Sequence, residues 1–311
     1  MRRIDADAVI AALDYRALIE RLREAFCEDV TTPLRHHHTI PVPGAAEATL
    51  LLMPAWQAGR YIGVKIATVI PSNVAHDLPS VMGLYVLLDG ETGTPLAVID
   101  GPSLTRRRTA AASALAANYL ARGDACRLLM VGTGALAPEL IEAHGVHREL
   151  KEIAVWGRSP EKAEALAARL DYPERRVRAV TDLEAAVREA DIVSCATLSN
   201  EPLIRGAWLT PGCHLDLVGG FRPTMREADD DAVRAARLYV DTREGALSEA
   251  GDMTDPLNRG VITKSDIRGD LFELARVEAA GRKDASEITL FKSTGTALED
   301  FAAAVLVAER S

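Results

Sequence analysis

The stretch LLMVGTGALAPELIEA, from Leu128 to Ala143, decides the fold class of this chain. It begins as an apolar run typical of a buried strand, turns through glycines and continues with helical spacing. Gly132, Gly134 and Ala137 match the G-x-G-x-x-[GA] pattern. The first glycine permits a tight turn, the second lets a pyrophosphate approach the backbone, and the small third residue lets the helix pack closely on the strand. The turn therefore predicts a dinucleotide-binding site.

The chain around this turn alternates strand, turn and helix. Further strands are expected in ELKEIAVW, RVRAV, DIVSCAT, CHLDLVGG and RLYVDT, and a helix in PEKAEALAARL. Alternation of buried apolar strands with helices indicates a parallel sheet covered on both faces. We therefore predict an α/β fold in which residues 123–292 form a Rossmann NAD(P)-binding domain.

The residues expected to contact the dinucleotide follow four strands. They are Gly132, Thr133, Gly134, Ala135, Leu136, Ala137, Trp156, Gly157, Arg158, Ser159, Ala196, Thr197, Val218, Gly219 and Gly220. An NAD site usually offers an acid to the ribose at the tip of the second strand. Here that tip carries Arg158 and Ser159, which suit a 2′-phosphate, so NADP(H) is favoured and NAD(H) is the alternative. Arg158 could instead be a solvated loop charge.

The rest of the chain has a different pattern. Two short helices are expected within residues 4–27, separated near Asp14 and Tyr15. The runs TLLLMPAW, YIGVKIATVIP and GLYVLLDGETGTPLAVID predict strands, with DGETG as a hairpin turn. A helix is expected from Leu104 to Ala121 after a Gly-Pro-Ser break, and the last segment, STGTALEDFAAAVLVAER, is expected to be a helix that packs back on this part. Residues 1–122 and 293–311 are therefore predicted to form an α+β substrate-binding domain with a largely antiparallel sheet.

Composition limits the partners of the protein. The chain has 311 residues, which suits two domains, and a net charge of -9. Such a charge argues against binding to nucleic acid or to an anionic membrane. No apolar run approaches the roughly 20 residues that span a bilayer, and the N-terminus lacks the features of a signal peptide. A cytoplasmic protein is expected.

Cations in the first third are the candidates for binding an acidic substrate. Lys65 is the one charge in the apolar run GVKIATVI, which suggests a cleft, although a solvated sheet face would also accommodate it. Arg35 and Arg108 suit bidentate binding of a carboxylate. The triplet His36 to His38 is not expected to bind a metal, because adjacent side chains of an extended segment point to opposite faces.

The motifs together resemble the ornithine cyclodeaminase/μ-crystallin family. They are PLR (33–35), MPAW (53–56), GVK (63–65), LTRRRTAAASALAA, VGTGALA, VWGRS, DIVSCAT, GCHLDLVGG and KSTGTALEDFAAA, in the family's order over nearly the whole chain. The resemblance implies a homodimer whose first domains share a β-barrel, a bound NAD(H) or NADP(H), and an active site between the domains. It also implies that Arg35, Lys65 and Arg108 are the carboxylate-binding and catalytic cations.

Two departures favour one branch of this family. Ornithine cyclodeaminases place acids where this sequence has Leu51 and Phe221, and those acids can hold a second ammonium. Without them a buried ammonium would cost several kcal/mol. A cyclic imino acid such as Δ1-pyrroline-2-carboxylate or Δ1-piperideine-2-carboxylate fits better, so we expect NAD(P)H-dependent reduction of such a ring to the L-amino acid. Ornithine cyclodeaminase, an alanine-type dehydrogenase and a μ-crystallin-like binding protein remain alternatives.

The substrate pocket is expected to involve a few further residues. They are Leu51, Met53, Thr109, Phe221 and Asp300. Asp300 could instead lie on a helix surface or between the domains. His214, another candidate, could instead be a core residue or lie behind the residues that contact the ligand.

Overall fold

The computed structural model describes residues 1–171, 175–220 and 222–311. The chain forms two compact units, Met1–Thr109 with Thr296–Ser311 and Ala110–Gly295. The boundary between Thr109 and Ala110 falls inside helix α3 (Gly101–Leu120). The second unit therefore extends further at both ends than the predicted 123–292.

A six-stranded sheet forms the frame of the first unit. Its strands are β1 (Arg2–Ile4), β2 (His36–Ile40), β3 (Ala48–Gln57), β4 (Tyr61–Val69), β5 (Val81–Asp89) and β6 (Pro95–Asp100), in the order β1-β6-β5-β4-β3-β2. All neighbours are antiparallel except β1 and β6, which confirms the predicted largely antiparallel sheet. The histidine triplet lies in β2, so its side chains alternate as expected.

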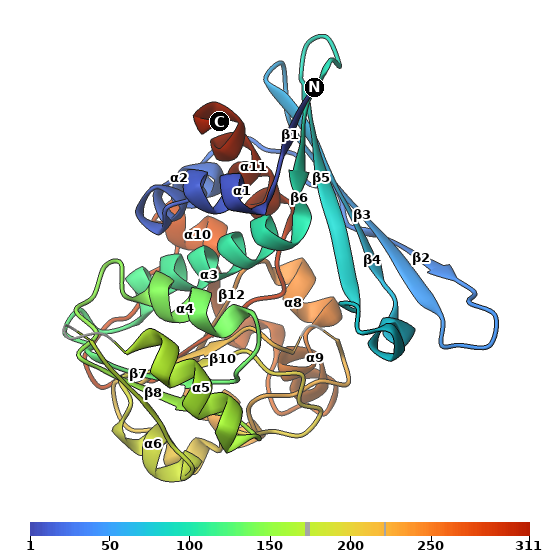
Figure 1. The fold of residues 1–311 in the computed structure, drawn as a ribbon. Coiled ribbons are helices and arrows are strands. Elements are labelled where there is room, and N and C mark those ends of the chain that lie inside the picture. The colour runs from blue at the N-terminus through green and yellow to red at the C-terminus, as the bar shows by residue number, and fades with distance from the viewer. Residues whose placement is uncertain (172–174, 221) are drawn as a thin grey trace. The chain divides into compact units, whose positions relative to one another are not determined.

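Helices α1 (Ala6–Ala12), α2 (Tyr15–Cys27) and α11 (Ala297–Arg310) belong to the same unit (Figure 1). The side chain of Asp14 accepts a hydrogen bond from the amide of Ala17, which starts α2 and explains the predicted break. Helix α11 packs against α2 and against β3 and β4. The prediction that the last helix packs back on the first part of the chain is confirmed.

Helix α3 begins earlier than predicted. Its first residue is Gly101 rather than Leu104, because the side chain of Asp100 accepts a hydrogen bond from the amide of Ser103 at 2.8 Å. Pro102 lies in the first turn, where a helix needs no amide donor. The Gly-Pro-Ser segment is therefore the first turn of the helix and not a break before it.

The second unit contains an eight-stranded, fully parallel sheet in the order β13-β12-β14-β11-β10-β7-β8-β9. The strands are β7 (Arg127–Val131), β8 (Glu152–Trp156), β9 (Arg176–Ala179), β10 (Ile192–Cys195), β11 (His214–Leu217), β12 (Arg237–Val240), β13 (Ile267–Asp270) and β14 (Thr289–Lys292). The α-helices that follow α3 in this unit are α4 (Leu136–His144), α5 (Pro160–Leu170), α6 (Leu183–Glu189), α7 (Asp230–Ala235), α8 (Arg243–Glu249), α9 (Gly251–Asn258) and α10 (Leu271–Ala275). Short 3-10 helices are η1 (Pro71–His76) in the first unit and η2 (Gly206–Trp208) and η3 (Lys264–Asp266) in the second. The prediction of an α/β fold with a Rossmann sheet is confirmed.

The strand order positions a ligand crevice. The strands that follow β7 in the chain are added first on one side of it, as β8 and β9, and then on its other side, as β10, β11 and β14. This change of side, between β7 and β10, is the switch point of a doubly wound sheet. Ligands of such folds bind outside the carboxyl ends of the strands at that point. None of the described helices is long and apolar enough to cross a membrane.

Candidate active site

The glycine turn lies between β7 and α4, at the switch point. Gly132 has φ +123°, and a Cβ there would lie 2.6 Å from the carbonyl oxygen of Ala196, so only glycine fits where the turn meets the loop after β10. A Cβ on Gly134 would have no neighbour within 4 Å, which leaves open space above the backbone. Ala137 is fully buried in the helix. The turn thus has the tight start, the open second position and the close packing that a pyrophosphate site needs.

A cavity of about 590 Å³ opens over this turn. Its lining includes the predicted contacts Gly132, Thr133, Gly134, Trp156, Gly157, Arg158, Ser159, Ala196 and Thr197. The predicted contacts Ala135, Leu136, Ala137, Val218, Gly219 and Gly220 do not line it, whereas Lys162, Leu198, Ser199 and Leu203 do and were not predicted. The residues present fit a dinucleotide along the edge of β8, β7 and β10.

The tip of β8 is positively charged. Arg158 is exposed and lines the cavity with Lys162, and the described lining residues include no carboxylate. The side chain of Ser159 accepts a hydrogen bond from the amide of Lys162 at 3.4 Å, so it caps α5. This end of the cavity suits an anion.

A buried cluster of charges forms the centre of the first unit. Lys65 is only 7% exposed, and its Nζ donates to both carboxylate oxygens of Asp300 at 3.1 and 3.2 Å. Arg108 donates from Nε to Asp300 at 3.0 Å and from Nη1 to Glu299 at 2.5 Å. Asp300 is fully buried, so the alternative that placed it on a helix surface is wrong. The low exposure of Lys65 likewise excludes the alternative that placed it on a solvated sheet face.

The sheet register brings the predicted pocket residues to one face. Met53 pairs with Lys65 across β3 and β4, and Leu51, two residues earlier, has the same orientation. Helix α11 packs on β3 and β4 and carries Asp300 to Lys65. Arg35 directly precedes β2, whose first residue pairs with Leu52, so it lies at the end of the strand beside Met53.

The charges in the cluster affect one another strongly. Burial lowers the pKa of Lys65 to about 8, with help from Arg108 and Arg35 and against the attraction of Asp300. Burial opposes ionisation of Asp300, but Arg108 and Lys65 outweigh it and hold its pKa below the ordinary value. Lys65 and Arg108 thus pair with the carboxylates of Glu299 and Asp300, and Arg35 is close enough to Lys65 to affect its pKa.

Several other residues complete the cluster or lie apart from it. Thr109 is 7% exposed beside Arg108. Glu299 was not predicted, although an acid pair inside the apolar helix sequence ALEDFAAAV is a visible signal. His214 is fully buried, burial lowers its pKa to about 3, and its Nδ1 lies 2.9 Å from the hydroxyl of Thr289, so it is a neutral core residue. The predicted pocket residue Phe221 lies outside the described residues.

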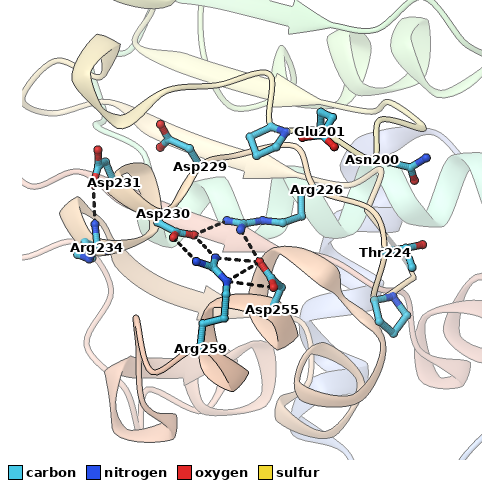
Figure 2. Close-up of a pocket in the computed structure, with 12 residues that line it drawn as sticks. Asn200, Glu201, Thr224, Arg226, Asp229, Asp230, Asp231, Arg234, Asp255 and Arg259 are labelled. Atoms are coloured by element: carbon cyan, nitrogen blue, oxygen red, sulfur yellow. Dashed lines mark hydrogen bonds and ion pairs between the residues drawn. The ribbon is translucent and has the colours of Figure 1, made fainter.

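A second, more polar cavity of about 780 Å³ lies in the dinucleotide-binding unit (Figure 2). Four of its charged side chains pair with one another: Arg226 contacts Asp230 at 2.9 Å and Asp255 at 2.6 Å, and Arg259 contacts the same two carboxylates at 2.6 and 2.8 Å. Because these charges compensate each other, the network ties the segment before α7 to α9 and is not a candidate for binding a charged substrate.

Comparison with known proteins identifies the family. The family model described as "Ornithine cyclodeaminase/mu-crystallin family" matches residues 7–311. A Δ1-pyrroline-2-carboxylate reductase of Paracoccus denitrificans is 40% identical over 90% of this chain and 91% of its own. The structure of the Δ1-pyrroline-2-carboxylate reductase of Thermococcus litoralis in complex with NADH and L-proline superposes with a TM-score of 0.93 at 32% identity, covering 100% of this chain and 97% of that one.

A third relative is an archaeal alanine dehydrogenase dimer with bound NAD, with a TM-score of 0.91 at 28% identity over 100% of this chain and 95% of that one. The match of the family model over almost the full length agrees with the glycine turn and with the cations on β4 and α3. The chain belongs to the ornithine cyclodeaminase/μ-crystallin family.

Proposed function

We propose that this protein uses a bound nicotinamide dinucleotide to reduce a cyclic imino acid, Δ1-pyrroline-2-carboxylate or its six-membered homologue, to the L-amino acid. The observation that carries the proposal is the buried pair of cations Lys65 and Arg108, with Arg35 nearby and with apolar neighbours in Leu51 and Met53. A substrate with one carboxylate and an apolar ring satisfies both features. The names of two relatives quoted above support the same chemistry.

The same cluster disfavours ornithine as substrate. Ornithine carries a second ammonium, which needs its own carboxylate when it leaves water. Glu299 and Asp300 are already occupied by Arg108 and Lys65, and position 51 is a leucine. A diamine would therefore bring one more uncompensated positive charge into the pocket than a protonated ring imine does.

The residues of the cluster would act by binding and orientation. Arg108 and Lys65 would hold the substrate carboxylate, and Asp300 would keep both cations in place through its bonds to each. Fixing the carboxylate fixes C2 of the ring, which is the positioning that hydride transfer requires. The chemistry that a bound nicotinamide dinucleotide would supply is donation of a hydride. With C2 held by the cluster as the acceptor, the electron pair of the C=N bond would pass to nitrogen, which would keep its proton. A protonated imine is already electrophilic, so little acid catalysis is required of the protein.

The decisive experiment is steady-state oxidation of NADH and NADPH with a small panel of substrates. We expect rapid oxidation with Δ1-pyrroline-2-carboxylate or Δ1-piperideine-2-carboxylate, and little with pyruvate plus ammonia. Release of ammonia from ornithine with comparable kcat/KM would establish a cyclodeaminase instead. Tight dinucleotide binding without turnover of any of these substrates would favour a binding protein.

We further propose that NADPH is preferred over NADH, because Arg158 and Lys162 form a cationic tip with no acid among the described lining residues. Replacing Arg158 by alanine removes a charge-assisted hydrogen bond to a 2′-phosphate, which is worth about 1.5 to 3 kcal/mol. KM for NADPH should therefore rise about tenfold to a hundredfold while KM for NADH stays nearly constant. Arg169→Ala, at the exposed far end of α5, is the matched control. Equal effects on both dinucleotides would exclude a phosphate role for Arg158.

The protein is also proposed to be a homodimer that uses the sheet face opposite α11. That face is apolar across four strands: its residues include Leu52, Pro54, Val64, Ile66, Leu84, Val86 and Val98, and Leu84 is 37% exposed. Contiguous apolar faces of this kind mark protein interfaces. A structural relative is itself a dimer, which supports the proposal.

A charge in the middle of this face tests the dimer. Val64 and Val86 are directly paired across β4 and β5, so Val64→Asp places a carboxylate at the centre of the apolar surface. We expect the variant to sediment as a monomer at concentrations where the natural protein is a dimer. Arg60→Asp, in the exposed turn before β4, should not change the mass. A dimer that survives Val64→Asp would place the interface elsewhere.

A further inference from the structure

Three charged side chains are completely buried together in the dinucleotide-binding unit. Glu227, Asp252 and Lys292 each have 0% exposure. The Nζ of Lys292 lies 3.4 Å from Asp252 and 4.0 Å from Glu227. Burying three charges carries a large desolvation penalty for each ion unless the charges compensate one another, so a cluster of this kind needs an explanation.

Glu227 ties together the ends of two neighbouring strands. Its Oε1 accepts hydrogen bonds from the amide of Thr197 at 2.7 Å and from the Thr197 hydroxyl at 2.9 Å, and its Oε2 accepts from the amide of Gly219 at 2.7 Å. Thr197 follows β10 and Gly219 follows β11. One carboxylate therefore sets the spacing of two loops that leave adjacent strands.

Asp252 and Lys292 hold that carboxylate in position. Asp252 accepts hydrogen bonds from the amides of Glu227 and Ala228 at 2.8 and 3.1 Å, which fixes the backbone that carries Glu227. Lys292, the last residue of β14, supplies the one cation within 4.0 Å of the two carboxylates among the described residues. Gly220 leaves room for this arrangement, since a Cβ there would lie 2.6 Å from Asp252 and 3.4 Å from Lys292.

The position of the hydrogen bonds made by Glu227 determines which part of the ligand they would affect. The cationic tip that suits the adenosine end of a dinucleotide belongs to β8, on one side of the glycine turn. A dinucleotide that follows the carboxyl edge of the sheet then extends its nicotinamide half over β10 and β11. Thr197 itself lines the cavity, and Gly219, which does not, follows the neighbouring strand β11. The loops that Glu227 ties together are thus those on which the nicotinamide half would rest.

We propose that Glu227, Asp252 and Lys292 are positioning residues that fix the loops under the nicotinamide half of the bound dinucleotide. The proposal rests on the dinucleotide binding included in the proposed function, and on no property of the imine substrate. Lys292 matters because two buried carboxylates without a cation would not both stay ionised. A protonated Glu227 would turn one acceptor oxygen into a donor facing an amide N–H, and the tie between the loops would be lost.

The charge balance of the cluster agrees with this role. Burial raises the pKa of Glu227 above its ordinary value; Lys292 opposes this shift and Asp252 adds to it. Removal of the Lys292 charge would therefore favour the protonated, non-bridging form at neutral pH.

Two ligands separate a positioning role from a merely structural one. NADH needs both halves of the site, whereas ADP-ribose carries the adenosine and the pyrophosphate without the nicotinamide. For Glu227→Gln we expect Kd for NADH to rise about tenfold, because the amide NH₂ must face either the Thr197 or the Gly219 amide, while Kd for ADP-ribose changes less than about twofold. Lys292→Met should show the same selective loss. Both Kd values are measured by calorimetric titration of the full chain.

The control is Glu244→Gln, which makes the same change at an exposed position in the first turn of α8 and should alter neither Kd. Should Lys292→Met fail to fold, the nearly isosteric Glu227→Gln decides alone. Equal weakening of both ligands would show that the cluster supports the whole sheet edge, and unchanged binding of both would show that it does not act on the site; either result overturns the proposal. An enzyme that binds NADH but reduces no cyclic imine would refute the proposed function while leaving this comparison intact.

Discussion

Replacing Lys65 by methionine is expected to lower kcat/KM for the cyclic imino acid about a thousandfold and to leave the affinity for NADH unchanged. Truncating one partner of a desolvated charge pair costs about 2 to 5 kcal/mol, which corresponds to a factor of some tens to several thousand. Lys65 is buried and bonded to Asp300, so the variant leaves Asp300 with one cation fewer and removes a positive charge that would pair with the substrate carboxylate. Methionine keeps the length and apolar stem of the side chain. Steady-state kinetics and NADH titration measure the two quantities separately.

Lys151→Met, at an exposed position before β8, is the control and should retain full activity. Substantial activity in Lys65→Met would contradict the assignment of the cluster as the carboxylate site.

The natural enzyme should show a matching pH dependence. Since the pKa of Lys65 is lowered to about 8, its charge is present below that pH and is lost above it. Inhibition by pyrrole-2-carboxylate, whose ring nitrogen does not titrate in this range, should therefore weaken as the pH rises above about 8.

Much of the fold could be predicted because local pattern and tertiary structure agree. Strand β7 is buried over Leu128 to Val131, and a fully buried parallel strand has to read as a continuous apolar run. Strand β2 was not predicted as part of the sheet, since its five residues are all exposed and lack the alternation of apolar and polar residues that identifies a strand. Its place is set by pairing with β3 and not by its own composition.

The site could be predicted in part, because a single charge in an apolar strand is a strong local signal. That signal identified Lys65. The same signal is present in ITLFKST, where it indicates Lys292, although Lys292 was not among the predicted site residues. The partners of these lysines could not be found in this way. Asp300 is 235 residues from Lys65 along the chain, and only the packing of α11 on the sheet brings the two together. Spacing in a sequence carries no information about such a contact.

Replacing Gly134 by alanine is expected to weaken NADH binding about a hundredfold without loss of stability. A Cβ at this position would have no neighbour within 4 Å, so the folded protein accommodates the methyl group easily. The space it fills is the space through which a pyrophosphate must approach the backbone, and overlap with a tightly packed group costs about 1 to 3 kcal/mol or more. Titration with NADH tests the expected loss of affinity, and the thermal unfolding midpoint of the same variant tests the expected unchanged stability.

Two other glycines supply matched comparisons. Gly123→Ala adds a methyl group in an exposed loop where it also meets no atom within 4 Å, so both NADH binding and stability should be retained. Gly132→Ala should lose both, because its φ of +123° is strained for alanine and its Cβ would lie 2.6 Å from the carbonyl oxygen of Ala196. If Gly134→Ala bound NADH as tightly as the natural protein, the pyrophosphate could not lie against this turn, and the assignment of the cavity to a dinucleotide would fail with it.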